Sequence, residues 1–191
     1  MAKDYSEDQL IQKSTAELLE QELGWKSVYA FDNEVLGEQG TLGRKTQSEV
    51  VLTRHLRLAL KRLNPWMTDK QLTEAVERMT SYMSSQTLMQ INEEKYGYLR
   101  DGVPVTRQKP NGETEEVRAR VMDFANVDNN ELIAVRELWI KGPIHKRRAD
   151  VVCFVNGLPV IFIELKNHGR NRQTLWGGCT DANPKLLLND T

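Results

Sequence analysis

Different spacings of hydrophobic residues along the chain predict different kinds of element. Apolar residues three and four positions apart predict helices, and alternation of apolar and polar residues predicts strands. The predicted helices cover residues 6–23, 46–63, 68–83 and 85–97. The predicted strands cover residues 26–31, 103–108, 114–124 and 132–140, with a hairpin turn at 110–112. Helices therefore belong mainly to the first half of the chain and strands to the second.

The stretch from Arg147 to Asn167 differs from the rest because its apolar residues are nearly continuous. Two runs of Val, Ile, Phe, Leu and Cys flank the turn signal Asn156-Gly157-Leu158-Pro159, which predicts a hairpin whose strands are apolar on both faces. Such strands lie in the middle of a sheet that is covered on both sides. Three charged residues interrupt this hairpin: Asp150, Glu164 and Lys166. Charges are costly in such a place, so these three are candidates for function.

The length of the turn decides whether the three charges can meet. Along a strand, Glu164 and Lys166 point to the same side, about 6.7 Å apart. A two-residue turn at Asn156-Gly157 would leave Asp150 on the opposite face from Glu164. A three-residue turn over residues 156–158, with a bulge, would set Asp150 directly opposite Glu164. The shorter turn would abolish the site, so the functional interpretation requires the longer turn and fails without it. We therefore predict the three-residue turn.

Two carboxylates and an ammonium group on one face suit metal-assisted hydrolysis of a phosphodiester. Neighbouring carboxylates repel each other and are usually compensated by a hard cation such as Mg²⁺, Mn²⁺ or Ca²⁺. Such a cation activates water and takes charge from the phosphate, while Lys166 orients the nucleophile or stabilises developing charge. Arg147 and Arg148, just upstream, would hold the nucleic acid. The alternative is a structural ion pair between Glu164 and Lys166. The Glu-x-Lys spacing alone is a weak signal, because Glu93-Glu94-Lys95 also has it in a polar helix.

Composition limits which partners overall charge can attract. The 191 residues, 39% of them hydrophobic, fit one domain with a small appendage at most. The 26 basic and 27 acidic side chains give a net charge of -1, so any nucleic-acid surface must be local. No apolar run could span a bilayer, and we expect a soluble, cytoplasmic protein without a membrane partner. Cys153 and Cys179 have neither zinc-site nor disulfide spacing, which predicts one core thiol and one surface thiol.

One local basic feature is the stripe formed by Arg54, Arg57 and Lys61 on the predicted helix 46–63. A solvated helix face is the ordinary explanation of such a stripe. Contact with a phosphate backbone is the alternative.

The stretch from Arg147 to Asn167 resembles the nuclease motif of the motor/nuclease (R) subunit of type I restriction enzymes, a branch of the PD-(D/E)xK restriction-endonuclease-like superfamily. Other segments follow the order seen in the N-terminal domain of that subunit, from about Tyr5 to Asn167. These segments are Ser6-Glu7-Asp8-Gln9-Leu10, Leu23-Gly24-Trp25, Leu42-Gly43-Arg44, Ser48-Glu49-Val50-Val51-Leu52, Leu63-Asn64-Pro65, Leu99-Arg100-Asp101-Gly102-Val103 and Asn129-Asn130-Glu131-Leu132. The resemblance implies an α/β fold with a central mixed sheet flanked by helices, and an endonuclease domain over residues 1–167.

The resemblance also implies a Mg²⁺-dependent DNA endonuclease and roles for its residues. Asp150 and Glu164 would be metal ligands together with the backbone carbonyl of Leu165, and Lys166 would be the catalytic lysine. The cofactor would be Mg²⁺, for which Mn²⁺ substitutes. ATP would act only through motor domains absent from this chain, which has no G-x-x-x-x-G-K-[ST] phosphate loop. The implied partners are double-stranded DNA and the methylation (M) and specificity (S) subunits.

Two departures from the family pattern leave a second function open. The first helix has Gln12 where the family commonly has a glutamate, and Gln12 and Glu17 are the candidates for that role. After Asn167 the family's Q-x-x-x-Y element is missing, because the fourth residue after Gln173 is Gly177. Residues 168–191 are thus a divergent or truncated tail. The alternative function is a catalytically impaired nuclease fold that docks DNA, the motor or the partner subunits.

Overall fold

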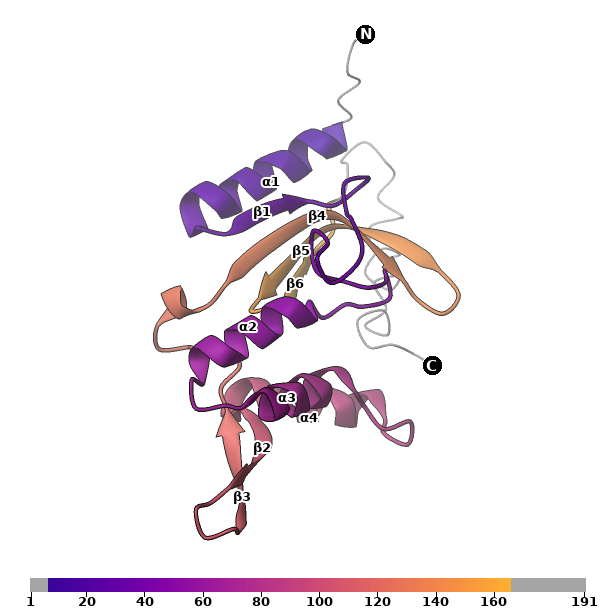
Figure 1. Cartoon of the computed structure of the whole chain (residues 1–191). Helices are drawn as coiled ribbons and strands as arrows, with labels where there is room; N and C mark the ends of the chain where they lie inside the picture. The colour runs from indigo at the N-terminus through magenta and orange to yellow at the C-terminus, as the bar shows by residue number, and fades with distance from the viewer. Residues whose placement is uncertain (1–6, 166–191) are drawn as a thin grey trace. The chain divides into compact units, whose positions relative to one another are not determined.

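The elements of the chain form an α/β structure. The computed structural model describes residues 7–165, with side chains from residue 12. The helices are α1 (Glu7–Leu23), α2 (Thr53–Leu63), α3 (Asp69–Thr80), α4 (Leu88–Asp101) and the 3₁₀ turn η1 (Val127–Asn129). The strands are β1 (Lys26–Tyr29), β2 (Val103–Gln108), β3 (Thr114–Ala119), β4 (Leu132–Lys141), β5 (Lys146–Val155) and β6 (Leu158–Ile163). A four-stranded mixed sheet, β1-β4-β5-β6, and a two-stranded sheet, β2-β3, confirm the predicted restriction-endonuclease-like fold class (Figure 1).

The chain divides into two compact units. The first unit comprises Met1–Val50, Leu132–Phe154 and Pro159–Thr191, and the second comprises Val51–Glu131 and Val155–Leu158. The first unit therefore contains α1 and most of the four-stranded sheet, and the second contains α2, α3, α4 and the β2-β3 sheet. The turn between β5 and β6 belongs to the second unit, so the predicted hairpin passes through both.

In the first unit, α1 packs against β1 and β4 (Figure 1). The helix gives way to β1 at Gly24, whose φ of 68° suits a residue without a side chain. β1 runs parallel to β4, with Ser27 opposite Ala134 and Tyr29 opposite Arg136. Ala134 is buried in a cluster that also contains Leu19 of α1. Because Ala134 and Arg136 are two residues apart, this register places Arg136 and Tyr29 on the face of the sheet that carries α1.

An irregularity in the middle of β4 changes the alternation of its side chains. Glu137 has a φ of 58°, which is rare for a residue other than Gly and typical of a bulge within a strand. Before it the partly exposed residue is Arg136, and after it the next is Trp139, three positions later rather than two. Arg136 and Trp139 can therefore share a face of the sheet, while Leu138 is fully buried.

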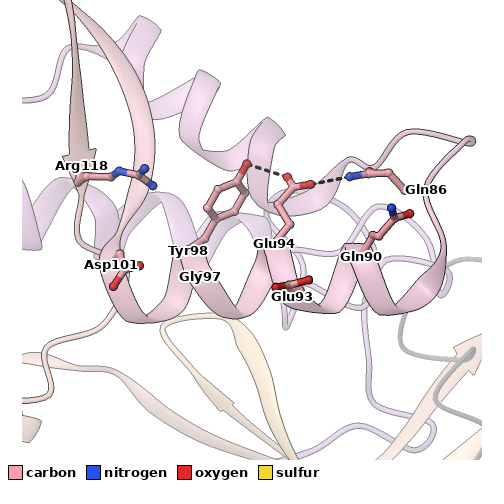
Figure 2. Close-up of a pocket in the computed structure, with 8 residues that line it drawn as sticks. All are labelled: Gln86, Gln90, Glu93, Glu94, Gly97, Tyr98, Asp101 and Arg118. Atoms are coloured by element: carbon pink, nitrogen blue, oxygen red, sulfur yellow. Dashed lines mark hydrogen bonds between the residues drawn. The ribbon is translucent and has the colours of Figure 1, made fainter.

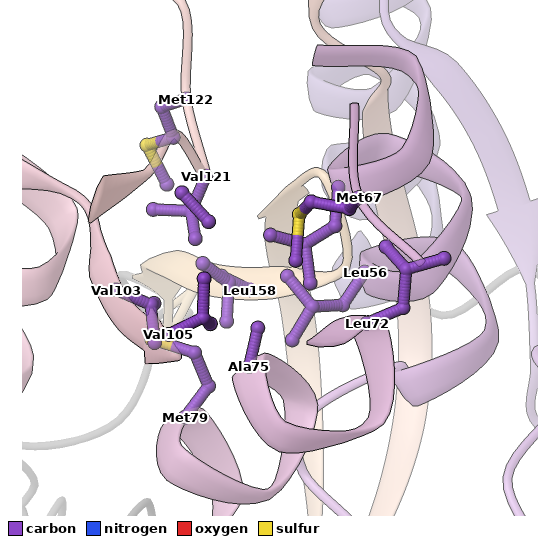
Figure 3. Close-up of a cluster of buried hydrophobic side chains, with 12 residues drawn as sticks. Leu56, Met67, Leu72, Ala75, Met79, Val103, Val105, Val121, Met122 and Leu158 are labelled. Carbon is purple, nitrogen blue, oxygen red and sulfur yellow. The ribbon is translucent and has the colours of Figure 1, made fainter. Parts of the chain in front are cut away.

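The second unit has an apolar core between its helices and its small sheet (Figure 3). The buried members are Leu56, Leu60, Met67, Leu72, Ala75, Met79, Val103, Val105, Ala119, Val121, Met122 and Leu158. Capping boxes fix the starts of α3 and α4, in which Thr68 pairs with Gln71 and Thr87 with Gln90. The predicted β2-β3 hairpin is confirmed. Its antiparallel register sets Val105 opposite Val117 and so puts alternate residues into this core.

One predicted helix start is wrong. The helix predicted from residue 46 begins only at Thr53. Tertiary hydrogen bonds use the backbone of the intervening segment instead: the Gln47 carbonyl accepts from the Lys141 amide at 3.0 Å, and the Glu49 carbonyl accepts from Arg44 at 3.1 Å. These bonds compete with the helical pattern that Thr46-x-x-Glu49 predicted.

Burial of the β5-β6 hairpin also differs from prediction in part. β5 is buried mainly in its second half. Burial raises the pKa of the Cys153 thiol there, so the predicted core thiol is confirmed. β6 forms the end of the described sheet, with Val160, Ile161 and Phe162 exposed, so its predicted place in the middle of the sheet is wrong. Cys179 lies outside the described residues. Between residues 7 and 165 no helix is long and apolar enough to cross a membrane.

Candidate functional site

Asp150 joins three segments of the first unit that are far apart in sequence. Its Oδ1 accepts a hydrogen bond from Gln12 Nε2 of α1 at 3.0 Å. Its Oδ2 accepts one from the backbone amide of Leu165, just after β6, at 2.7 Å. Gln12 is only 6% exposed, so its amide is fixed against this carboxylate rather than directed to water. The structure therefore brings together Gln12, Asp150 and Leu165 from among the predicted site residues.

The predicted three-residue turn is wrong. β5 ends at Val155 and β6 begins at Leu158, which leaves only Asn156 and Gly157 between the strands. Their φ values are 52° and 80°, the positive pair that a type I′ turn needs and that Asn-Gly adopts readily. The Asn156 side chain also supports this turn, since it donates to the Val121 carbonyl at 2.9 Å and accepts from the Glu131 amide at 2.8 Å.

The two-residue turn does not separate Asp150 from the Glu164 segment, because the strand ends too early for the ladder rule to apply. β6 stops at Ile163, and Glu164 and Leu165 lie beyond it. Alternation of faces holds only within a strand, so the register does not fix where Glu164 points. The hydrogen bond from the Leu165 amide to Asp150 shows that the segment after β6 lies next to this carboxylate. Glu164 is exposed, and Lys166 lies outside the described residues.

The donor chemistry of this site fits a hydrated hard cation. Each oxygen of Asp150 accepts one described hydrogen bond and keeps capacity for another interaction. Mg²⁺ is commonly held by one or two carboxylates plus water and substrate phosphate, so Asp150 and Glu164 would suffice. In the part of the chain that the structure describes, no three His, Cys, Asp or Glu residues are grouped to hold a metal. The residues present thus suit an ion such as Mg²⁺ or Mn²⁺ that keeps several waters, rather than an ion held entirely by protein ligands.

The other predicted site residues have different surroundings. Glu17 forms an exposed ion pair with Lys13 at 3.6 Å, so the structure gives Gln12, not Glu17, the contact with Asp150. Arg147 is exposed. Arg148 is also exposed, but its Nε lies 2.6 Å from Oε2 of the buried Glu137. Glu137 was not predicted, because its role depends on a bulge that no local sequence pattern announces.

Cations and aromatic rings interleave on one surface of the first unit. We call Tyr29, Phe31, Arg136, Trp139, Lys146 and Arg148 the aromatic–cation surface. Arg136 lies 5.1 Å from the Tyr29 ring centroid, and Lys146 lies 4.2 Å from that of Trp139. Arg148 lies between two rings, 5.0 Å from Phe31 and 5.8 Å from Trp139. The alternate spacing of Tyr29 and Phe31, and of Lys146 and Arg148, was a sequence signal that could have indicated this surface.

A pocket in the second unit involves the other Glu-x-Lys sequence (Figure 2). This open pocket of about 420 Å³ lies along α4 and is lined by Gln86, Gln90, Glu93, Glu94, Gly97, Tyr98, Asp101 and Arg118. Glu94 accepts from Tyr98 and from Gln86, and these bonds hold the pKa of its carboxyl below the usual range. Lys95 donates to the carbonyls of Arg78 and Ser81. These side chains therefore support the fold.

The predicted basic stripe on α2 is partly neutralised. Arg57 pairs with Asp69 at 3.0 Å and donates to Thr73 at 3.0 Å, which ties it to α3. Lys61 is exposed. The tie between Arg57 and Asp69 favours the solvated helix face over a phosphate contact.

Comparison with known proteins identifies the family of the chain. The family model of the N terminus of the type I restriction enzyme R protein matches residues 4–183, past Asn167. The type I restriction enzyme HindI endonuclease subunit of Haemophilus influenzae is 36% identical over 148 residues, which are 77% of this chain and 14% of that protein.

A more distant relative covers almost the whole chain. The putative type I restriction enzyme MjaIXP endonuclease subunit of Methanocaldococcus jannaschii is 25% identical over 188 residues, 97% of this chain and 17% of that protein. The chain thus spans less than a fifth of the length of these relatives. It belongs to the family of type I restriction enzyme R protein N-terminal domains.

Proposed function

We propose that the chain is the Mg²⁺-dependent DNA endonuclease domain of a type I restriction-modification enzyme. It would hydrolyse DNA phosphodiesters after ATP-driven translocation by motor domains that lie outside this chain. The observation that carries the proposal is the Asp150 carboxylate, held by Gln12 at 3.0 Å and by the Leu165 amide at 2.7 Å. Double-stranded DNA and the M and S subunits are its proposed partners, and the cytoplasm its proposed location.

Each residue has a distinct task in this proposal. Asp150 and Glu164, with the Leu165 carbonyl, would bind Mg²⁺ or Mn²⁺. The bound cation would supply a more acidic water and stabilise charge on the phosphate. Lys166 would orient the attacking water or balance charge that develops on the phosphate. Gln12 would keep the Asp150 carboxylate in one orientation, because its buried amide donates to Oδ1.

Two basic side chains would hold the DNA near this carboxylate. Arg148 precedes Asp150 by two residues in β5, which places both on one face in a regular strand. Glu137 and two aromatic rings limit the motion of Arg148. Arg147 would contact the phosphate backbone as an exposed cation, which contributes affinity without sequence preference. Sequence recognition would then fall to the S subunit.

The test is linearisation of supercoiled plasmid by the assembled complex carrying Glu164→Gln or Asp150→Asn in the R subunit. Loss of a metal ligand should slow cleavage by at least about 100-fold, as other losses of transition-state charge stabilisation do. Glu93→Gln is the matched control, because Glu93 is also an exposed glutamate that opens a Glu-x-Lys tripeptide, and it should cleave normally. Full cleavage by both site variants would refute the assignment.

The second candidate function is the docking module without catalysis, which the amide at Gln12 favours over an acid. Titration of Mn²⁺ while following thermal unfolding distinguishes the two. An intact two-carboxylate site binds the ion in the folded state and raises the melting temperature. The rise should be absent in Asp150→Asn. Equal curves for the wild type and this variant would favour docking.

A further inference from the structure

The aromatic–cation surface contains positive charge that its own surroundings do not balance. Of its three cations, only Arg148 has a carboxylate partner, Glu137. For Arg136 and Lys146 the structure gives ring contacts and no ion pair among residues 12–165. Cations on exposed rings gain only about 0.5–1 kcal/mol each, so this arrangement is not explained by stability alone. Arg136 and Lys146 are therefore available to bind an anion.

Arg136 gives a second, independent indication. Its Nε is a buried donor without a hydrogen-bond partner among the described residues. Native proteins leave few buried donors unpaired, and each such donor costs free energy. The ring of Tyr29 lies 5.1 Å from this guanidinium, so Arg136 has an aromatic neighbour but no acceptor for its Nε among the described residues. A phosphate oxygen is the kind of acceptor that a guanidinium binds well.

The aromatic rings of this surface indicate which kind of anion it would bind. Tyr29 is 37% exposed, and Trp139 and Phe31 are partly exposed. Aromatic faces next to cations are the combination that binds single-stranded nucleic acid, because every base has a face that can stack. In a duplex the base faces are already stacked on one another, so the rings could contact only the backbone. The surface therefore fits a single strand better than a duplex.

The strand that carries two of the cations also leads to the Asp150 carboxylate. Lys146, Arg148 and Asp150 follow one another at intervals of two residues in β5. We infer that the aromatic–cation surface binds a single strand of DNA, with bases stacked on Tyr29 and Trp139 and phosphates on Arg136 and Lys146. This inference deepens the proposed function, on which it rests, by naming the form of DNA that would approach Asp150.

Binding without cleavage tests the inference. The 191-residue chain is titrated into fluorescein-labelled oligothymidylate in EDTA, and fluorescence anisotropy gives the affinity. The single strand should bind more tightly than a duplex of equal length. An abasic strand, which keeps the phosphates but has no bases, should bind about tenfold more weakly, as expected for the loss of stacking. Equal affinity for the abasic strand, or tighter binding of the duplex, would overturn the inference.

Matched variants locate the binding surface. Tyr29→Leu and Arg136→Gln should each weaken single-strand binding about tenfold. Tyr96→Leu and Arg100→Gln are the controls, since Arg100 lies 5.9 Å from the Tyr96 ring on α4 and forms the same type of pair elsewhere. Tyr29→Phe keeps the ring and should bind like the wild type. Equal weakening by the control variants, or none by the Tyr29 and Arg136 variants, would contradict the inference.

The affinities also separate this inference from the proposed nuclease. EDTA removes divalent metal, so strand binding is measured without cleavage. If the chain binds single strands but the assembled wild-type complex does not cut plasmid in Mg²⁺, the binding surface is supported and the nuclease is contradicted. The opposite result is also possible. If the Tyr29→Leu and Arg136→Gln variants bind single strands like the wild type and their complexes cut plasmid normally, the nuclease is supported and the binding surface is contradicted. Circular dichroism and melting curves show which variants are folded. Arg136→Gln, at a partly exposed residue, provides the test if Tyr29→Leu does not fold.

Discussion

The two units use their positive-φ residues in opposite ways. Among residues 7–165, two residues other than Gly have positive φ: Asn156 at 52° in the second unit and Glu137 at 58° in the first. Asn tolerates this conformation, and its amide here satisfies backbone groups around the hairpin turn. Glu does not favour it, and the strain costs about 1–2 kcal/mol. In the second unit the residue with the unusual conformation, Asn156, stabilises the fold. In the first unit the corresponding residue, Glu137, holds the exposed Arg148.

Three buried polar side chains, one in the second unit and two in the first, differ in the same way. In the second unit Asn64 donates to the Leu60 and Arg120 carbonyls and accepts from the Arg120 amide, so its partners are backbone groups. In the first unit Gln12 and Glu137 have charged side chains as partners, Asp150 and Arg148. Backbone partners hold a fold together, whereas side-chain partners orient charges. We therefore expect substitutions in the second unit to act mainly on stability and those in the first mainly on binding and cleavage.

The largest expected effect is a core truncation in the second unit. Leu56 in α2 is fully buried, and Leu56→Ala should lower the free energy of unfolding by about 2–5 kcal/mol. Leu58 in the same helix is 58% exposed, and Leu58→Ala should change it by no more than about 0.5 kcal/mol. Urea unfolding followed by circular dichroism measures both. A cost below 1 kcal/mol for Leu56→Ala would mean that the second unit does not depend on this core.

The next effect compares glycine substitutions at the two positive-φ residues. Gly adopts positive φ without strain, so each substitution isolates what the side chain contributes. Asn156→Gly leaves the Val121 carbonyl and the Glu131 amide without their partner and should cost about 2–3 kcal/mol. Glu137→Gly loses a partly exposed ion pair but relieves strain, so stability should change by less than about 1 kcal/mol.

The same pair of variants should rank the other way in DNA binding. Glu137→Gly frees Arg148 and should weaken single-strand binding several-fold, whereas Asn156→Gly should leave binding unchanged once the protein is folded. Unfolding curves and anisotropy titrations on the same samples give both quantities. If Glu137→Gly destabilised the chain more than Asn156→Gly and left binding intact, the contrast between the units would be wrong.

How far the sequence predicted each unit follows from how local its signals are. The β2-β3 hairpin was predicted because its alternation and its turn at residues 110–112 are local, and the structure confirms it. The helix start at residue 46 was predicted wrongly because Lys141 of β4 and the neighbouring Arg44 side chain supply competing hydrogen bonds. The turn length at Asn156-Gly157 was predicted wrongly for a different reason. The Asn-Gly pair correctly indicates a two-residue type I′ turn, but we predicted a longer turn because the expected site geometry required it.

The candidate site was predicted in its residues but not in its geometry. The resemblance indicated Asp150 and Gln12, which the structure joins by a hydrogen bond. What no pattern could show was that β6 would end at Ile163, which frees Glu164 from the ladder. Glu137 was missed because a bulge arises from pairing between strands, and its sequence neighbours look like those of any other strand. The roles of Asp150, Gln12, Glu164 and Lys166 in a nuclease stay predictions.

The smallest expected effect tests whether a carboxylate in the second unit is purely structural. Asp123 accepts hydrogen bonds from the Asn129 side chain at 2.9 Å and from the amides of Asn126 and Ala125 at 3.1 Å. These bonds hold the pKa of Asp123 below its ordinary value, the Asn129 amide contributing most. Because the folded pKa is the lower one, this stabilisation is present above the unfolded pKa of about 3.9 and is lost as pH falls through the folded pKa.

Asp123→Asn should therefore be less stable than the wild type at pH 7, and the difference should shrink as the pH approaches 3. Chemical unfolding at a series of pH values measures it. Asp128→Asn, in the same loop and exposed, is the control and should follow the wild-type curve within about 0.5 kcal/mol at every pH. Single-strand binding should be the same in all three proteins. A pH-independent difference would mean that the Asp123 loop is held by packing rather than by its carboxylate, and a loss of DNA binding would mean that the second unit serves more than the fold.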